Sequence, residues 1–159
     1  MKNILLLLAS GLVAVAGAVS AATSEPMEHK LTTPQEIQWG PAPPSLPPGA
    51  QAAVLFGDPG KEGEFALRLR MPKGYRIAPH THPKPELVTV ISGTFRLGMG
   101  EPADLARAKP MQAGSFIGLS PGIVHFAGAD EDTVIQLNST GPWTLTYVNP
   151  KDDPRQQTK

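Results

Sequence analysis

The stretch HTHPKPE, residues 80–86, contains two of the chain's four histidines and a carboxylate. Side chains two positions apart on a strand point to the same face, so we expect His80 and His82 to project together. The prolines at 83 and 85 favour extended backbone before them and remove strand-pairing donors, which indicates a corner or a sheet edge. If the chain turns back at this corner, Glu86 reaches the pocket that the two imidazoles face.

A third histidine follows a tight turn later in the chain. SPGIVHF, residues 120–126, places a Pro–Gly turn before His125. Three imidazoles and one carboxylate suit a divalent first-row ion such as Mn, Fe, Co, Ni, Cu or Zn, and four protein ligands leave coordination positions open. We therefore expect four residues to hold a divalent transition metal of unspecified identity: His80, His82, Glu86 and His125. Taken singly, each also fits a surface pair, a solvated acid or a hydrogen-bonded core residue, and His29 is not expected to take part.

Composition narrows the classes of fold and function. The chain has 159 residues, enough for one domain, and no cysteine, which excludes disulfides and thiolate metal sites. Its formal net charge is +0 and its basic residues are scattered, so no nucleic-acid partner is expected. The 16 glycines and 18 prolines favour short strands joined by turns.

Short apolar or alternating segments begin at residue 52. Phe65, Leu67 and Leu69 alternate with charged residues, which is the period of a half-buried strand. Residues 101–109 form the only expected helix, and residues 133–150 are expected to form a final hairpin turned at STGP. The pattern predicts an all-β sandwich or barrel. Expected strands lie in residues 52–57, 64–71, 75–82, 86–93, 94–100 and 115–129.

The spacing of these residues resembles the two-motif signature of the cupin superfamily. The first motif, G-x5-H-x-H-x3-E-x6-G, is matched by Gly74, His80, His82, Glu86 and Gly93. The second, G-x5-P-x-G-x2-H-x3-N, is matched by Gly114, Gly122 and His125, with Ser120 and Ala129 replacing its proline and asparagine. The resemblance covers residues 52–148. It implies a double-stranded β-helix, or jelly-roll barrel, with a metal in its mouth held by the same two histidines, glutamate and third histidine.

The chain divides into four expected parts. Residues 1–22 resemble a secretory signal peptide cleaved near Ala21 or Ala22, so we expect an exported protein, periplasmic or secreted, without stable membrane insertion after cleavage. The alternative is an uncleaved membrane anchor. Residues 23–50 are expected to form an extended, proline-rich strap anchored by Trp39. Residues 51–150 form the barrel, and residues 151–159 a charged tail that frays.

Three functions are compatible with these residues. The first is a metal-dependent enzyme, an oxygenase or decarboxylase acting on a small organic acid or phenolic compound. The second is a metal-containing binding or sensing module without turnover, and the third a metal-free interaction domain. No spacing argument selects a general acid or base. A homodimer through residues 40–48 is also compatible, and we expect the apolar lining of the site to include Val88, Phe95, Leu97 and Phe116.

Overall fold

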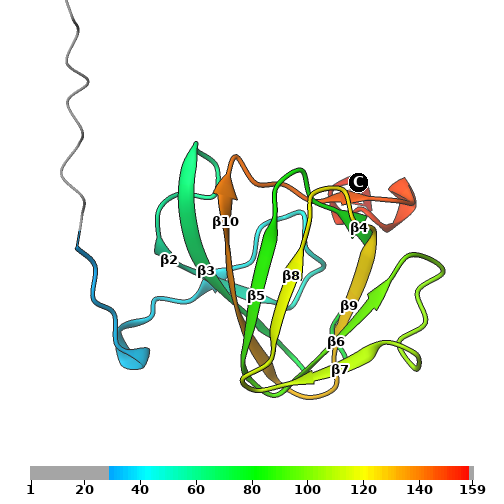
Figure 1. Cartoon of the computed structure of the whole chain (residues 1–159), viewed down its shortest axis with the longest axis horizontal. Helices are drawn as coiled ribbons and strands as arrows, with labels where there is room; N and C mark the ends of the chain where they lie inside the picture. Colours follow the sequence, from blue (N-terminus) through cyan, green and yellow to red (C-terminus); the bar gives the residue numbers. More distant parts are fainter. Residues whose placement is uncertain (1–28, 158–159) are drawn as a thin grey trace, which may run out of the picture.

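The computed structural model describes residues 29–157, which form two antiparallel sheets facing each other (Figure 1). The expected signal peptide lies outside these residues. One sheet has the order β1-β2-β3-β10-β5-β8 and the other β11-β4-β9-β6-β7. The strands are β1 (Gly40–Pro41), β2 (Gln51–Phe56), β3 (Gly63–Met71), β4 (Arg76–Thr81), β5 (Glu86–Ser92), β6 (Thr94–Met99), β7 (Lys109–Gln112), β8 (Phe116–Leu119), β9 (His125–Ala129), β10 (Thr133–Gly141) and β11 (Thr146–Tyr147).

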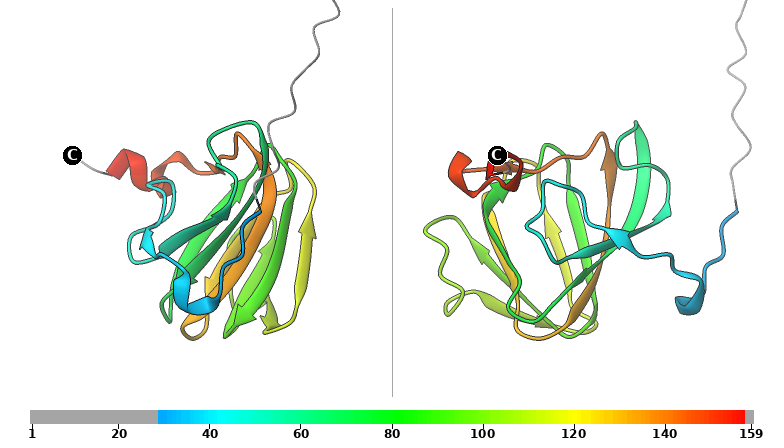
Figure 2. Two further views of the ribbon diagram at one scale, coloured as in Figure 1. Left: turned by 90° about the vertical axis from the view of Figure 1, so that its left-hand side faces the viewer. Right: turned by 180° about the vertical axis from the view of Figure 1, so that it is seen from behind.

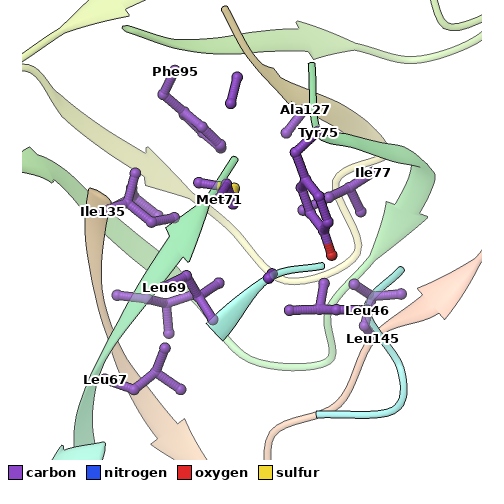
Figure 3. Packing of buried hydrophobic residues seen from close by; sticks show 14 of the residues in the cluster. Leu46, Leu67, Leu69, Met71, Tyr75, Ile77, Phe95, Ala127, Ile135 and Leu145 are labelled. Carbon is purple, nitrogen blue, oxygen red and sulfur yellow. The ribbon is translucent and has the colours of Figure 1, made fainter. Parts of the chain in front are cut away.

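Alternating side chains build the core between the sheets. On β3, Phe65, Leu67 and Leu69 are buried as expected, and β10 pairs with β3 on one side and β5 on the other. Figure 3 shows apolar side chains from both sheets and from the strap filling this space. Full burial of one such side chain contributes about 1.5–3 kcal/mol, so the two inner faces hold the sheets together. The predicted all-β barrel is confirmed.

Two glycine-bearing turns connect the strands. Gly93, between β5 and β6, has a φ of 76°, and a Cβ there would lie 2.6 Å from the carbonyl oxygen of Asp132. Gly74, before β4, has a φ of 82°. Residues with a side chain rarely adopt this left-handed backbone conformation. At Gly93 the neighbouring backbone also leaves no room for a Cβ atom.

The proline-rich strap packs on its own barrel. Leu46 is buried in the core, and the hydroxyl groups of Tyr75 and Tyr147 donate to the backbone carbonyls of Pro47 and Ser45 on either side of it. Figure 3 shows the Tyr75 hydroxyl pointing toward the strap, with Leu46 beside Leu145. The strap runs next to the C-terminal segment (Figure 2). These apolar side chains are therefore used within the chain, and the expected dimer stays a prediction.

Trp39 belongs to the strap and lies against the barrel. The guanidinium carbon of Arg70 sits 4.1 Å from the centre of its ring. A stacked cation and aromatic face attract each other, so this contact fixes the start of the strap on β3.

The expected helix at residues 101–109 is wrong. After Asp104 the chain makes a single turn, in which the Arg107 and Ala108 amides donate to the Asp104 carbonyl. From Lys109 it becomes β7, whose first residue pairs with Leu97 of β6. Pairing with a sheet edge satisfies more backbone groups than a helix this short, so tertiary structure overrides the local preference.

The expected final hairpin is also wrong. β10 belongs to one sheet, whereas β11 pairs with β4 in the other. Residues 142–145 therefore cross between the two sheets instead of turning back. This crossing brings the half-buried Trp143 to the wall of the central cavity.

The described part of the C-terminal tail packs on the barrel. It contains the short 3-10 helix η2 (Pro150–Asp152) and the single helical turn α1 (Pro154–Gln157), while a further 3-10 turn, η1 (Pro34–Glu36), lies within the strap. Arg155 bonds both carboxylate oxygens of Asp153 at 2.8 Å and the Leu145 carbonyl at 3.1 Å. These bonds tie the segment to the barrel, and the expected fraying of the tail stays a prediction. Within residues 29–157, no helix has the length and apolar character needed to cross a membrane.

Candidate metal centre

Both sheets contribute to one cluster of polar side chains inside the barrel. His80 on β4 pairs directly with His125 on β9. His82 follows the end of β4 at the corner, and Glu86 begins β5 in the opposite sheet. One ring nitrogen from each histidine lies within 4.8 Å of the others, and all three rings are buried. The four residues that the sequence analysis grouped are therefore brought together.

The corner between the sheets places the first two histidines. Pairing between β4 and β9 shifts register between Ile77 and His80, where Pro79 has no N–H to donate. This irregularity turns both Ile77 and His80 inward, although they are three positions apart. The amide of Gly122 donates to the His82 carbonyl at 2.9 Å, which joins the corner to the turn before His125.

Backbone carbonyls orient all three imidazoles. The Nδ1 atoms of His80 and His82 lie 2.7 and 2.8 Å from the carbonyl oxygens of Ala78 and Thr144. Nδ1 of His125 lies 3.0 Å from the Ile123 carbonyl. A carbonyl only accepts, so each Nδ1 donates its proton, and Nε2 is the ring nitrogen left to bind a metal. Histidines that bind metals are commonly oriented in this way.

The Glu86 carboxylate faces the Nε2 atoms of two of these rings. Its Oε2 lies 3.1 Å from Nε2 of His125 and 3.7 Å from Nε2 of His82. Burial acts to raise the pKa of the Glu86 carboxyl, but the hydrogen bond with His125 and the neighbouring histidines outweigh burial, so its pKa lies below its usual value. Two acceptors at 3.1 Å require a shared proton, and a cation could replace that proton.

Burial keeps the first two rings neutral. It lowers the pKa of His80 to about 3, with a further contribution from the nearby His125, and it also lowers the pKa of His82. Neutral imidazole is the form that binds a metal. At neutral pH these rings therefore present lone pairs instead of positive charge.

An unpaired nitrogen in the cluster shows that these residues fit a divalent transition ion. Nε2 of His82 is buried and has no hydrogen-bond partner. Leaving a buried acceptor unpaired costs about 1–3 kcal/mol, which a bound cation would offset. Three imidazole nitrogens and a carboxylate suit several divalent ions, so the donor set does not identify the metal.

The cavity around these groups is small and mostly apolar. Its volume is about 20 Å³, enough for about one water molecule. Val88, Phe95 and Leu97 line it as expected. Phe116 does not, since its side chain is 63% exposed. Side chains alternate along β8, and Ile117 and Leu119 point inward. The inward-facing positions of this strand therefore start at residue 117 and not at residue 116.

Trp143 is a site residue that the sequence analysis missed. Its indole stacks on the His82 ring, with ring centres 4.3 Å apart and an interplanar angle of 15°. It also lines the cavity. Its place depends on residues 142–145 crossing between the sheets, and no spacing signal in the sequence predicts that crossing.

Comparison with known proteins supports the same family. The family described as the ChrR cupin-like domain matches residues 27–144. No curated protein matches. Similar solved structures include an acetylacetone dioxygenase from Acinetobacter johnsonii, at 17% identity over 84% of this chain and 86% of that one, with a TM-score of 0.63.

Two further structures share the fold. The polyketide cyclase RemF from Streptomyces resistomycificus is 15% identical over 82% of this chain and 94% of that one, with a TM-score of 0.62. The Rhodobacter sphaeroides complex of SigE with the anti-sigma ChrR is 22% identical over 69% of this chain and 52% of that one, with a TM-score of 0.50. At these identities the likeness concerns the fold, and it agrees with the expected double-stranded β-helix.

Proposed function

This chain belongs to the ChrR cupin-like domain family of the cupin superfamily, and on that basis we propose that it is a metal-dependent enzyme of the oxygenase type acting on a small organic compound. The observation that carries the proposal is the convergence of three buried imidazole nitrogens within 4.8 Å of one another. Each ring is oriented by a carbonyl on Nδ1, and Glu86 adds a carboxylate beside two of the rings. We assign His80, His82, Glu86 and His125 as the metal ligands.

The bound ion would supply Lewis-acid polarisation of a substrate oxygen and electron exchange with dioxygen. The chain's own residues hold the ion and exclude water. The single carboxylate leaves residual positive charge on a divalent ion, which favours a substrate with an anionic oxygen such as a carboxylate or phenolate. Apolar side chains around the cavity lower the local dielectric and strengthen that attraction.

Oxygenation suits this lining better than decarboxylation. A decarboxylase must deliver a proton to the carbon that loses carbon dioxide. Among the described residues that line the cavity, Glu86 is the only carboxylic acid, and no lysine, arginine or tyrosine is present. The acetylacetone dioxygenase among the similar structures supports the same choice.

Metal analysis followed by oxygen uptake tests the proposal. The purified full chain is expected to contain one transition ion, and His82→Gln should lose it. His29→Gln is the matched control, since His29 is exposed and outside the cluster. Oxygen consumption with a panel of small acids and phenols should depend on the metal. A metal-free wild-type protein, even after reconstitution, would contradict the assignment of the ligands.

A metal-containing binding or sensing module is the second candidate. The small cavity and the absence of a separate acid or base in its described lining favour it. The similarity to a structure that contains the anti-sigma ChrR gives further support. Tight binding of one compound to the metal-loaded protein, without oxygen uptake across the panel, would select this candidate.

We also propose that the protein is exported, on the strength of residues 1–22. Fractionation of the producing cell should then place it outside the cytoplasm. Mass measurement of that fraction should give a mature chain that begins after Ala21 or Ala22. A full-length chain in the membrane fraction would favour the uncleaved anchor instead.

A further inference from the structure

Two buried polar atoms without a partner belong to residues that line the metal cavity. Among the described residues, Nε2 of His82 and Nε1 of Trp143 are the buried side-chain nitrogen or oxygen atoms that lack a hydrogen bond. Both residues line the same cavity. The first atom is an acceptor, because Nδ1 of that ring donates to Thr144, and an indole nitrogen is a donor only. A metal ion would use the first atom and leave the second unpaired.

Residues 143 and 144 hold His82 from two directions. The Trp143 ring stacks on the imidazole face, and the carbonyl of Thr144 accepts the Nδ1 proton at 2.8 Å. Phe65 contacts the indole edge to face, with ring centres 6.0 Å apart. The indole is therefore packed between the His82 ring and Phe65.

The remaining lining restricts what that N–H can bind. Apart from the four proposed ligands, Trp143 is the one described lining residue with a polar side-chain atom. The three imidazole Nδ1 protons are already taken by carbonyls. A ligand with two acceptor oxygens would therefore find one cation and one indole N–H, surrounded by apolar side chains.

We propose that Trp143 is a specificity-determining residue whose indole N–H donates to a short-chain carboxylate bound at the metal centre. The inference rests on the proposed function and narrows its substrate class. One carboxylate oxygen binds the positively charged ion, and the other accepts a hydrogen bond from the indole N–H. The cavity is small, so the whole ligand can have no more than a few atoms.

Formate binding to the zinc-loaded full chain tests this role without requiring turnover. Calorimetry should show formate binding to wild-type protein and binding about tenfold weaker in Trp143→Phe, which keeps an aromatic ring but has no N–H. Zinc content should be equal in the two proteins. Benzoate, which carries the same charge on a larger body, should bind more weakly than formate to the wild type.

Fluorescence provides a second measurement that avoids altering the site. The chain has two tryptophans, so Trp39→Phe leaves Trp143 as the only emitter. Formate should shift its emission in the zinc-loaded protein, and the shift should follow the calorimetric binding curve. Trp39 stacks on Arg70, and neither residue lines the cavity. This variant should therefore bind formate as the wild type does.

The outcomes separate the two proposals. Failure of the wild type to bind zinc or any other transition ion would remove the metal centre itself. Normal zinc binding with equal formate affinity in wild type and Trp143→Phe would leave the metal centre in place and overturn the role of the indole. Absence of formate binding to the zinc-loaded wild type would overturn it too.

Discussion

Acidification should destabilise the metal-free protein well before its carboxylates titrate. Burial lowers the pKa of His80 to about 3 in the folded chain, while its ordinary value is 6.5. Below pH 6.5 the unfolded chain therefore binds a proton that the folded chain does not. Stability must fall as the pH falls, by about 1.4 kcal/mol per pH unit for each histidine held neutral. The loss is absent above pH 6.5 and continues toward pH 3.

Between pH 6.5 and 4.5, His80 alone should remove about 2–3 kcal/mol from the free energy of unfolding. His82, whose pKa is also lowered by burial, adds loss in the same direction. The low pKa of Glu86 acts the same way, but only near and below its ordinary value of 4.5. The chosen window therefore isolates the histidines.

Urea unfolding of chelator-treated protein at several pH values measures this slope. In His80→Asn, which cannot titrate, the slope should be smaller than in the wild type by about 1.4 kcal/mol per pH unit. His29→Gln, an exposed histidine outside the cluster, should keep the wild-type slope. Equal slopes in His80→Asn and wild type would refute the conclusion that His80 is held neutral by burial.

Three other perturbations test the fold around the site. Leu46→Ala should lower the free energy of unfolding by about 2–5 kcal/mol in urea, because the side chain is only 6% exposed and lines the cavity; a cost below 1 kcal/mol would show that the strap is not packed there. Tyr147→Phe should reduce the loss of stability at alkaline pH, since burial raises the pKa of Tyr147 to about 12 and the folded state resists an ionisation that the unfolded chain undergoes near pH 10; pH-dependent thermal melts measure it, and an unchanged alkaline limb would contradict it. Gly93→Ala should cost more than Gly100→Ala in the same urea assay, because both glycines have a left-handed φ but only Gly93 would place a Cβ against Asp132; equal costs would contradict the close approach.

The local pattern of the sequence determined the donor set and the fold class. Strand spacing placed His80 and His82 on one face, and the prolines that follow forced the corner that leads to Glu86. Alternation at Phe65, Leu67 and Leu69 predicted a half-buried strand. These features survive folding because extended backbone fixes side-chain direction over a few residues, whatever the rest of the chain does.

Features that depend on which strands become neighbours were decided by the tertiary structure. Residues 101–109 do not form the expected helix, because β7 pairs with β6. Phe116 faces outward because pairing with β5 fixes the register of β8. The crossing at residues 142–145 set Trp143 against His82, which lies far away in the sequence. Such contacts form when distant segments bury apolar surface against each other. The sequence of one strand does not specify the partner against which that strand packs.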